Sequence, residues 1–492
     1  MVKAKKNRKM ARSRKGRPSS ASRSAERPRP GRKVLVIGLD CADPDLIFRV
    51  LRDRLPNIKM MMEKGIFGNL RSVIPPITIP AWLCMATGRD PGALGLYGFR
   101  HRKGKSYDGY WIANSTTSNS PAVWDLVGRV GKRSTVIGFP PSFPPRPING
   151  RMVSCFITPD ASAEYTYPPE LKEEVEALTG GYIFDITFRS DKKEDIRKEL
   201  WEMTRTHLVT AEHLVKKKDW DLFWYVEIGT DRLHHAFWKY FDPRHAKYSP
   251  GHEYASVIPD YYRMLDDALG RILRALSDDT VVLVVSDHGA KPMEGVVAVN
   301  EWLINEGYLV LREPPAGPGT KLENADIDWE RTRAWGWGGY YARIFFNVKG
   351  RESSGVIRPE DLEAEKAELR KRLEAMKGPD GGPLKTKVFV PEEIYDECKG
   401  DVPDLMVFFG DLAWRSAGTI GWGQTFLTDN DTGPDDAMHD WEGIIIAYDP
   451  RRKLGKRIDT ASLLDITPTI LGLMGVPRPK GLKGRPIKEL MA

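Results

Sequence analysis

Six residues of types that bind metal ions stand at or near the ends of apolar segments in this sequence. They are three aspartates and three histidines: Asp40, Asp231, His235, Asp287, His288 and His439. Carboxylate and imidazole ligands together suit Zn²⁺, with Mn²⁺ and Fe²⁺ as alternatives. Six such ligands and a bridging nucleophile are enough for a pair of divalent metal ions. A metal pair about 4 Å apart can hold the attacking and leaving oxygens of a phosphoryl displacement.

The nucleophile that this chemistry needs is predicted at Thr78, in the segment PPITIPAWLCMATG. A threonine hydroxyl is a weak nucleophile at neutral pH, and contact with a divalent metal lowers its pKa. Thr87 and Ser72 lie nearby in the sequence and are the alternative hydroxyl groups. His234 is the alternative to His235 as a ligand, although the Asp-x-x-x-His spacing favours His235.

Three other features have both a chemical and a structural interpretation. The basic residues at 100–102 are able to bind a substrate phosphate, but a solvated loop is the simpler interpretation. The aromatic segment 335–341 is able to stack a nucleobase, whereas packing in a core is the more common role of such residues. Cys41 and Cys84 flank the predicted site in the sequence, and we expect buried, inert thiols.

The elements that must position these residues alternate between strands and helices. Continuous apolar runs predict buried, parallel strands at 34–39, 134–139, 221–228, 280–287 and 443–449. Helices are expected at 44–64, 195–217, 259–277 and 461–474, with a charged helix at 359–377. This alternation predicts an α/β fold with a doubly wound, mostly parallel sheet and helices on both faces. Ligands bind at the carboxyl ends of the strands in such sheets, so one edge is expected to collect the aspartates and histidines.

Charge and composition divide the chain of 492 residues into unequal parts. Residues 1–33 hold 14 of the 75 Lys and Arg residues and one of the 67 acidic residues, so their net charge is +13. The rest of the chain has a net charge of −5, which gives +8 for the whole chain. We expect a disordered basic tail at 1–33, a catalytic core at 34–299 and 436–492, and an insertion or cap at 300–435. With no signal-peptide pattern, no transmembrane segment and only 4 Cys, the expected location is cytoplasmic.

The ordered motifs resemble those of the alkaline phosphatase superfamily, most of all its type I phosphodiesterase/nucleotide pyrophosphatase branch and predicted phosphohydrolase/phosphomutase group. The resemblance covers about 34–478 and rests on VLVIGLD, PPITIPAW…TGRDPG, GTDRLHHAFW, SDHG and MHDWEG. It implies an alkaline-phosphatase-like fold with two metal sites. One site would be formed by Asp40, Thr78, Asp287 and His288, and the other by Asp231, His235 and His439. Thr78 would attack phosphorus, and water would hydrolyse the resulting phospho-threonine.

The predicted activity is therefore a two-metal phosphodiesterase or nucleotide pyrophosphatase with a small-molecule phosphodiester substrate. Ala81 stands where many nucleotide pyrophosphatases have Asn, which weakens the inference to nucleotides. Sulfatase activity is disfavoured because the segment from Thr78 to Trp82 lacks the convertible Cys and the Arg of that signature. A phosphomonoesterase or phosphoglycerate-mutase-like phosphotransferase is an alternative, although the mutase typically uses Ser and inserts its second domain soon after it.

An alternative of another class makes the protein a factor that binds nucleic acid or an anionic surface through residues 1–33. A charge of +13 in this segment is enough for salt-dependent binding to a phosphate backbone. The complete set of candidate ligands favours an enzyme instead. The sequence predicts no substrate-binding residue and leaves the oligomeric state open.

Overall fold

The computed structural model describes residues 31–491, so the basic tail predicted at 1–33 lies outside the described residues except for its last three. Arg32 pairs with Asp449 at 2.7 Å, and Lys33 is the first residue of a strand. Within this described range, no helix combines the length and the apolar content needed to cross a membrane.

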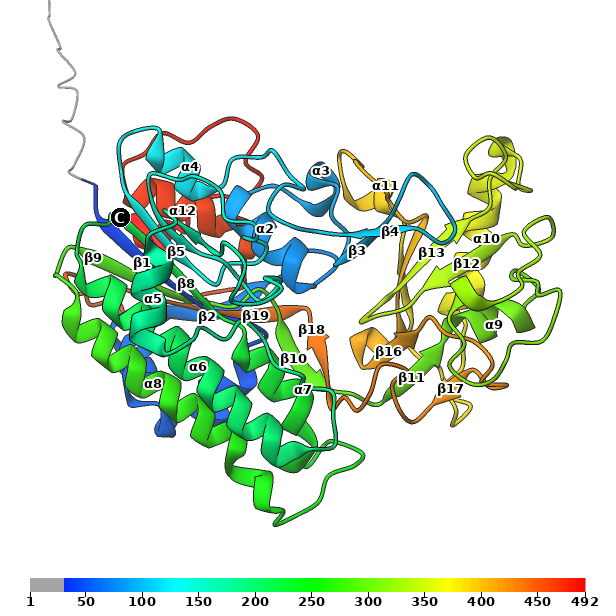
Figure 1. Cartoon of the computed structure of the whole chain (residues 1–492), viewed down its shortest axis with the longest axis horizontal. Helices are drawn as coiled ribbons and strands as arrows, with labels where there is room; N and C mark the ends of the chain where they lie inside the picture. The colour runs from blue at the N-terminus through cyan, green and yellow to red at the C-terminus, as the bar shows by residue number, and fades with distance from the viewer. Residues whose placement is uncertain (1–30, 492) are drawn as a thin grey trace, which may run out of the picture.

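The predicted α/β fold with a mostly parallel sheet is confirmed (Figure 1). Five strands run parallel to one another: β1 (Lys33–Leu39), β5 (Ser134–Ile137), β6 (Gly150–Val153), β8 (Leu222–Glu227) and β9 (Thr280–Val285). The other strands of this main sheet are β2 (Ile66–Arg71), β7 (Thr166–Tyr167), β19 (Glu442–Tyr448), β20 (Lys456–Arg457) and β21 (Ala461–Ser462). Their order is β20-β2-β19-β9-β1-β8-β5-β6-β7, and β21 also pairs with β2.

Strand β19 differs from the prediction, because it runs antiparallel to both of its neighbours. Ile445 pairs with Val285 on β9 and with Gly68 on β2. An antiparallel strand begins at the edge where its parallel neighbours end. The segment before β19, which contains His439, therefore lies at the carboxyl edge of the sheet, whereas a parallel strand would have placed it at the opposite edge.

Helices cover both faces of the main sheet (Figure 1). One face carries α1 (Pro56–Lys64), α5 (Leu171–Thr179), α6 (Lys193–Lys216), α7 (Gly229–Phe241) and α8 (Val257–Ala275). The other carries α2 (Thr78–Thr87), α4 (Val123–Gly128) and α12 (Ile466–Leu473). Successive residues of β1 face opposite sides, so Leu35 and Ile37 join the first core while Val34 and Val36 join the second.

The helix predicted at 44–64 is wrong as a single element. The segment forms a π-helical turn at Leu46–Val50, a 3₁₀ turn at Arg52–Arg54 and then α1, which begins at Pro56. Proline has no backbone N–H and disfavours helical dihedrals in the residue before it, so a helix can begin at Pro56 but not continue through it.

Residues 295–427 form a separate body beside the core, on the right in Figure 1. One sheet contains β12 (Ala334–Trp337), β13 (Ala342–Phe346), β14 (Lys387–Phe389) and β15 (Leu405–Phe408). A smaller sheet contains β11 (Gly295–Ala298), β16 (Trp414–Ala417) and β17 (Phe426–Leu427), and the helices are α9 (Val299–Asn305) and α10 (Leu362–Glu374). A two-stranded ribbon of β10 (Gly289–Pro292) and β18 (Ala437–Asp440) joins this insertion to the core.

Candidate metal centre

The first group of predicted ligands gathers around His288, at the ends of β1 and β9. Asp40 directly follows β1, and Asp287 and His288 follow β9. The His288 Nε2 atom lies 3.2 Å from Asp287 Oδ2 and 3.7 Å from Asp40 Oδ1. Thr78 is the first residue of α2, and its hydroxyl oxygen lies 3.5 Å from the same Nε2 atom. Trp82, one turn later, donates its indole N–H to Asp40 Oδ2 at 2.7 Å.

The second group gathers around Asp231, in the first turn of α7. His235 is four residues further along this helix, so the two side chains share one face. Asp231 Oδ1 lies 3.2 Å from His235 Nε2 and 3.6 Å from His439 Nε2. The other ring nitrogen of His439, Nδ1, donates to the Pro76 carbonyl at 2.8 Å, which leaves Nε2 with its lone pair toward Asp231. The three donor atoms lie within 4.8 Å of one another.

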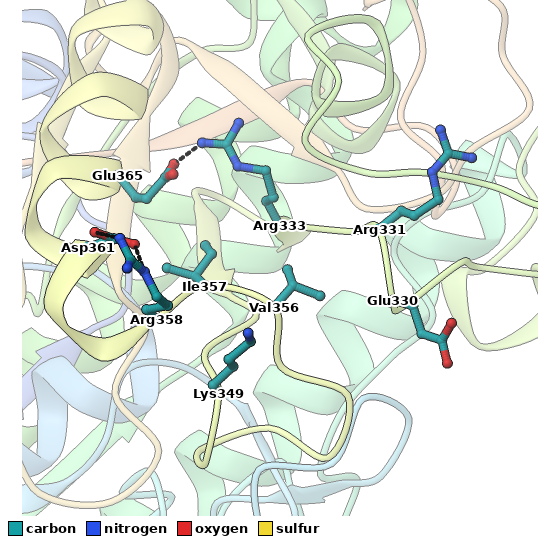
Figure 2. Close-up of a pocket in the computed structure, with 9 residues that line it drawn as sticks. All are labelled: Glu330, Arg331, Arg333, Lys349, Val356, Ile357, Arg358, Asp361 and Glu365. Atoms are coloured by element: carbon teal, nitrogen blue, oxygen red, sulfur yellow. Dashed lines mark hydrogen bonds and ion pairs between the residues drawn. The ribbon is translucent and has the colours of Figure 1, made fainter.

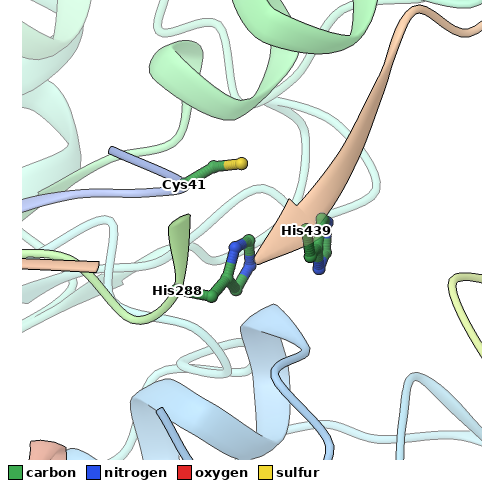
Figure 3. A group of neighbouring side chains, drawn as sticks. All are labelled: Cys41, His288 and His439. Atoms are coloured by element: carbon green, nitrogen blue, oxygen red, sulfur yellow. The ribbon is translucent and has the colours of Figure 1, made fainter. Parts of the chain in front are cut away.

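The two groups of ligands lie next to each other and share neighbours, although the family resemblance assigned them to two distinct metal sites. Donor atoms of Asp40, Asp231 and His288 also lie within 4.8 Å of one another. The rings of His288 and His439 stack with centroids 3.7 Å apart. Figure 3 shows these two histidines with Cys41, and β18 brings His439 beside the loop that carries His288. All seven residues predicted as ligands or nucleophile thus lie together at the carboxyl edge of the sheet.

Several buried atoms in these two groups are suited to bind divalent cations. Four side-chain atoms of the two ligand groups are buried and have no hydrogen-bond partner within the described residues: Asp40 Oδ1, Asp231 Oδ1, Asp287 Oδ2 and His439 Nε2. A buried polar atom without a partner costs about 1–3 kcal/mol, and more when it is charged. Divalent metal ions held by the two groups would satisfy all four, since each atom belongs to an oxygen- or nitrogen-donor ligand type.

The electrostatics of the groups also favour added positive charge. Burial raises the pKa of Asp40 and of Asp287 well above the usual value, and the charges of neighbouring aspartates raise both further. Burial would also raise the pKa of Asp231, but His235 and His439 outweigh it and lower that pKa. Burial lowers the pKa of His439 and thereby favours the neutral imidazole that binds metals.

Sequence reasoning missed Asp435, which holds His235 in place. Its Oδ1 atom accepts the His235 Nδ1–H at 2.6 Å. Its Oδ2 atom accepts from Arg189 Nε at 2.8 Å and from Arg415 at 3.3 Å. Burial would raise the pKa of Asp435, but His235 and Arg189 lower it, so the carboxylate stays charged. A carboxylate on the distal nitrogen of a metal-binding histidine fixes the tautomer and the ring. The only signal in the sequence was the position of Asp435, four residues before His439.

The alternative residues near the site have other partners. His234 Nε2 lies 3.1 Å from the Tyr262 hydroxyl, and burial lowers the pKa of His234 to about 3. The Cys41 thiol donates to the Gly289 carbonyl at 3.4 Å. Burial raises the pKa values of Cys41 and Cys84, so both are buried thiols as we expected, although the Cys41 sulfur also lies within 4.8 Å of donor atoms of His288 and His439.

The basic segment 100–102 is not the solvated loop that we favoured. Arg102 is fully buried and pairs with Asp401 at 2.9 Å and Glu352 at 3.1 Å, so it joins the core to the insertion. Within the aromatic segment, Trp335 lies in the core of the insertion, as expected. Tyr340 does not, because its hydroxyl lies 3.1 Å from His235 Nε2.

A cavity of about 420 Å³ lies in the insertion, and it contains none of the predicted site residues (Figure 2). Charged side chains line it, and several already have partners. Arg333 bonds to Glu365, and Arg358 bonds to Asp361 at 2.6 Å. The cavity is therefore a polar hollow within the insertion and not part of the metal centre.

The chain resembles known proteins in sequence and in fold. The family model for type I phosphodiesterase/nucleotide pyrophosphatase matches residues 34–441. Phosphonoacetate hydrolase from Sinorhizobium meliloti 1021, solved with phosphonoacetate, has a similar fold: TM-score 0.59, 16% identity, and coverage of 91% of this chain and 96% of that chain. Murine ectonucleotide pyrophosphatase/phosphodiesterase 5, an inactive threonine-to-alanine variant with AMP, gives a TM-score of 0.52 at 15% identity and the same coverage. No curated protein matches the chain.

The match of the family model covers most of the chain, and the structural likeness confirms the alkaline-phosphatase-like fold. The predicted class of activity, a metal-dependent phosphoric ester hydrolase, is likewise confirmed by the family and the metal-binding groups. The chain belongs to the type I phosphodiesterase/nucleotide pyrophosphatase family.

Proposed function

We propose that this enzyme hydrolyses phosphodiesters with two bound divalent cations and Thr78 as the nucleophile. The observation that carries the proposal is the position of the Thr78 hydroxyl, 3.5 Å from His288 Nε2 and beside a group of buried, unpaired donor atoms. Asp40, Thr78, Asp287 and His288 would hold one cation, and Asp231, His235 and His439 the other. Zn²⁺ suits this mixture of carboxylates and imidazoles, with Mn²⁺ and Fe²⁺ as alternatives.

The residues of the chain supply position and charge for this reaction. Two cations in these groups would lower the pKa of the Thr78 hydroxyl and neutralise charge on the phosphoryl oxygens. Thr78 begins α2, so its hydroxyl stands at the end of a helix where backbone N–H groups are unpaired and favour an anion. Trp82 fixes the Asp40 carboxylate from the same helix. Thr78 attacks phosphorus, its proton passes to the departing oxygen, and one alcohol leaves. Water then hydrolyses the phospho-threonine ester, which restores Thr78 and releases a phosphomonoester.

Two structural relatives support parts of this proposal. The murine relative is described as inactive when a threonine is replaced by alanine, and it holds AMP, a phosphomonoester of a nucleoside. The Sinorhizobium relative holds phosphonoacetate and so acts on a phosphonate. A phosphodiester with a nucleoside or another small alcohol is our proposed substrate class, and the monoester and the phosphonate are the competing outcomes of the assay.

The test compares a chromogenic phosphodiester, the corresponding monoester, a phosphoglycerate and phosphonoacetate, with Zn²⁺ or Mn²⁺ added to chelator-treated enzyme. The diester is expected to be the best substrate. Thr78→Ala is expected to lower the rate by about a thousandfold or more. Thr87→Ala is the matched control, since Thr87 lies at the other end of α2 and donates to the Leu83 carbonyl. Full activity of Thr78→Ala would show that the assigned nucleophile is wrong.

We also propose a cellular location for the protein and a binding role for its basic tail. All four cysteines are free, which supports the proposed cytoplasmic location. Contact of residues 1–33 with nucleic acid or an anionic surface concerns residues that, apart from 31–33, lie outside the described range. Deletion of residues 1–30, which keeps Arg32 and Lys33 in place, would test it, because binding to RNA or anionic vesicles should fall while hydrolysis stays unchanged.

A further inference from the structure

Tyr340 brings the insertion into contact with the metal centre. It follows β12 in a turn whose Gly338 lies so close to Gly418 that an added Cβ atom would be 2.3 Å from a backbone nitrogen. The Tyr340 ring stacks on His439 with centroids 3.7 Å apart and an interplanar angle of 24°. Because His439 also stacks on His288, a row of three rings runs from the insertion to the neighbour of the proposed nucleophile.

The hydroxyl of Tyr340 is held toward the second group of ligands. Its oxygen lies 3.1 Å from His235 Nε2 and accepts a hydrogen bond from Arg189 at 2.7 Å. The Arg415 guanidinium lies over the ring, 4.5 Å from its centroid. Both arginines are fixed by Asp435, which also takes the Nδ1–H of His235. One buried carboxylate therefore aims the His235 Nε2 atom and, through Arg189, the phenol oxygen at the same place.

Three of the distances between these donor atoms are close to those expected for ligands of one ion. An ion bound at about 2.0–2.2 Å by nitrogen and oxygen ligands has donor atoms about 3.3–3.6 Å apart. In the structure, His235 Nε2 is 3.1 Å from the Tyr340 oxygen and 3.2 Å from Asp231 Oδ1, which is 3.6 Å from His439 Nε2.

We propose that the Tyr340 hydroxyl oxygen is a fourth protein ligand of the cation that Asp231, His235 and His439 hold. This inference rests on the metal site of the proposed function. On binding, the O–H bond breaks, the proton goes to solvent, and the oxygen lone pair forms the bond to the cation. Asp231, His235, His439 and Tyr340 would then supply four protein ligands, whereas a catalytic zinc site typically has three protein ligands. The insertion would thereby take part in holding this cation.

The test uses the full chain and measures binding as well as activity. Fe³⁺ bound by a tyrosine oxygen gives a charge-transfer band in the visible spectrum, so ferric-loaded wild type is expected to be coloured. Tyr340→Phe keeps the ring stacked on His439 and removes only the oxygen. It is expected to lose the band and to bind one Zn²⁺ equivalent at least about 10-fold more weakly in competition with a chelator, since loss of even a residue that only orients a ligand costs that much. Tyr341→Phe is the matched control, since the neighbouring hydroxyl donates to the Tyr97 carbonyl and not to the ligand group.

The outcomes separate this inference from the proposed function. Ferric-loaded wild type without the band, or Tyr340→Phe with the band and the Zn²⁺ affinity of Tyr341→Phe, would overturn the role of Tyr340. Asp231→Asn is expected to lose one equivalent of Zn²⁺ altogether. If Asp231→Asn binds as many equivalents as the wild type, the second metal site itself is wrong. Thermal unfolding of each metal-free variant would verify that it is folded.

Discussion

Replacement of Asp435 by asparagine would test how much of the metal affinity comes from a residue that touches no proposed cation. Its carboxylate is buried and accepts three side-chain hydrogen bonds, from His235, Arg189 and Arg415, and a longer one from the Ala437 backbone N–H. Asparagine has nearly the same shape, but only one of its two terminal atoms accepts a hydrogen bond. Its NH₂ group would face either the imidazole N–H or the guanidinium groups, so one donor would oppose another.

Two magnitudes follow from these contacts. Loss of the group that orients a metal-binding histidine lowers metal affinity about 10–100-fold, or about 1.4–2.8 kcal/mol. Arg189 and Arg415 would also lose the charge that balances them. Removal of one partner from a buried ion pair costs about 3–5 kcal/mol. The metal-free Asp435→Asn protein is therefore expected to lose about 3 kcal/mol of unfolding free energy, since the amide oxygen still accepts one hydrogen bond.

The assay is Zn²⁺ titration of chelator-treated protein in competition with a coloured chelator, together with urea unfolding of the metal-free form. Asp436→Asn is the matched control, because Asp436 is the buried neighbour that pairs with Lys239 at 3.3 Å and does not bond to the His235 ring. Asp435→Asn with the Zn²⁺ affinity of the control would refute the idea that this carboxylate prepares His235 for a cation.

Three further perturbations test the core around the site. Trp82→Phe removes the hydrogen bond to Asp40 and is expected to lower the unfolding free energy by about 1–2 kcal/mol and to slow hydrolysis; unchanged urea unfolding would contradict this. In Gly38→Ala the new Cβ atom would stand 2.4 Å from the Trp82 ring, so a loss of about 1–3 kcal/mol is expected, and an unchanged melting temperature would argue against such close packing. His207→Gln breaks the buried pair with Glu227 and is expected to cost about 3 kcal/mol in the metal-free protein. Burial lowers the pKa of His207, but Glu227 outweighs it and raises that pKa above 6.5. Burial raises the pKa of Glu227, but His207 outweighs it and lowers that pKa below 4.5. The pair therefore stabilises the fold most between pH 4.5 and 6.5. Its contribution falls as the pH rises through the raised pKa of His207 or drops through the lowered pKa of Glu227. If the difference in unfolding free energy between His207→Gln and wild type does not vary with pH, the ion pair is not its cause.

Apolar continuity was enough to predict the parts of the site that follow parallel strands. The runs before Asp40 and Asp287 are buried on both faces, so their direction and their ends were readable from the sequence. His439 lies at the carboxyl edge of the sheet, as expected, but the expectation assumed a parallel strand after it. Only an antiparallel β19 places His439 at that edge. Strand direction depends on pairing between distant segments, and a local pattern does not contain it.

The missed residues lie where no periodic pattern exists. Tyr340 stands in a glycine-rich turn between two strands of the insertion, and Asp435 in the loop before β18. Their partners are up to about two hundred residues away in sequence, as for Asp435 and His235. Composition identified Tyr340 only as one aromatic residue among several, and packing alone distinguishes it from Trp335, which lies in the core of the insertion.

The strand order of the main sheet determines when each strand can pair while the chain is being synthesised on the ribosome. Strand β2 is made early, yet all of its partners, β19, β20 and β21, come after residue 441. At about 5–20 residues per second, roughly 20–75 s pass before β2 can pair, and β9 has one free edge during part of that time. Nascent chains that stop before β19 would expose unpaired edges on two strands, β2 and β9, and such edges are templates for aggregation. His439 emerges just before β19, so the last metal ligand and the strand that joins β2 to β9 are made one after the other.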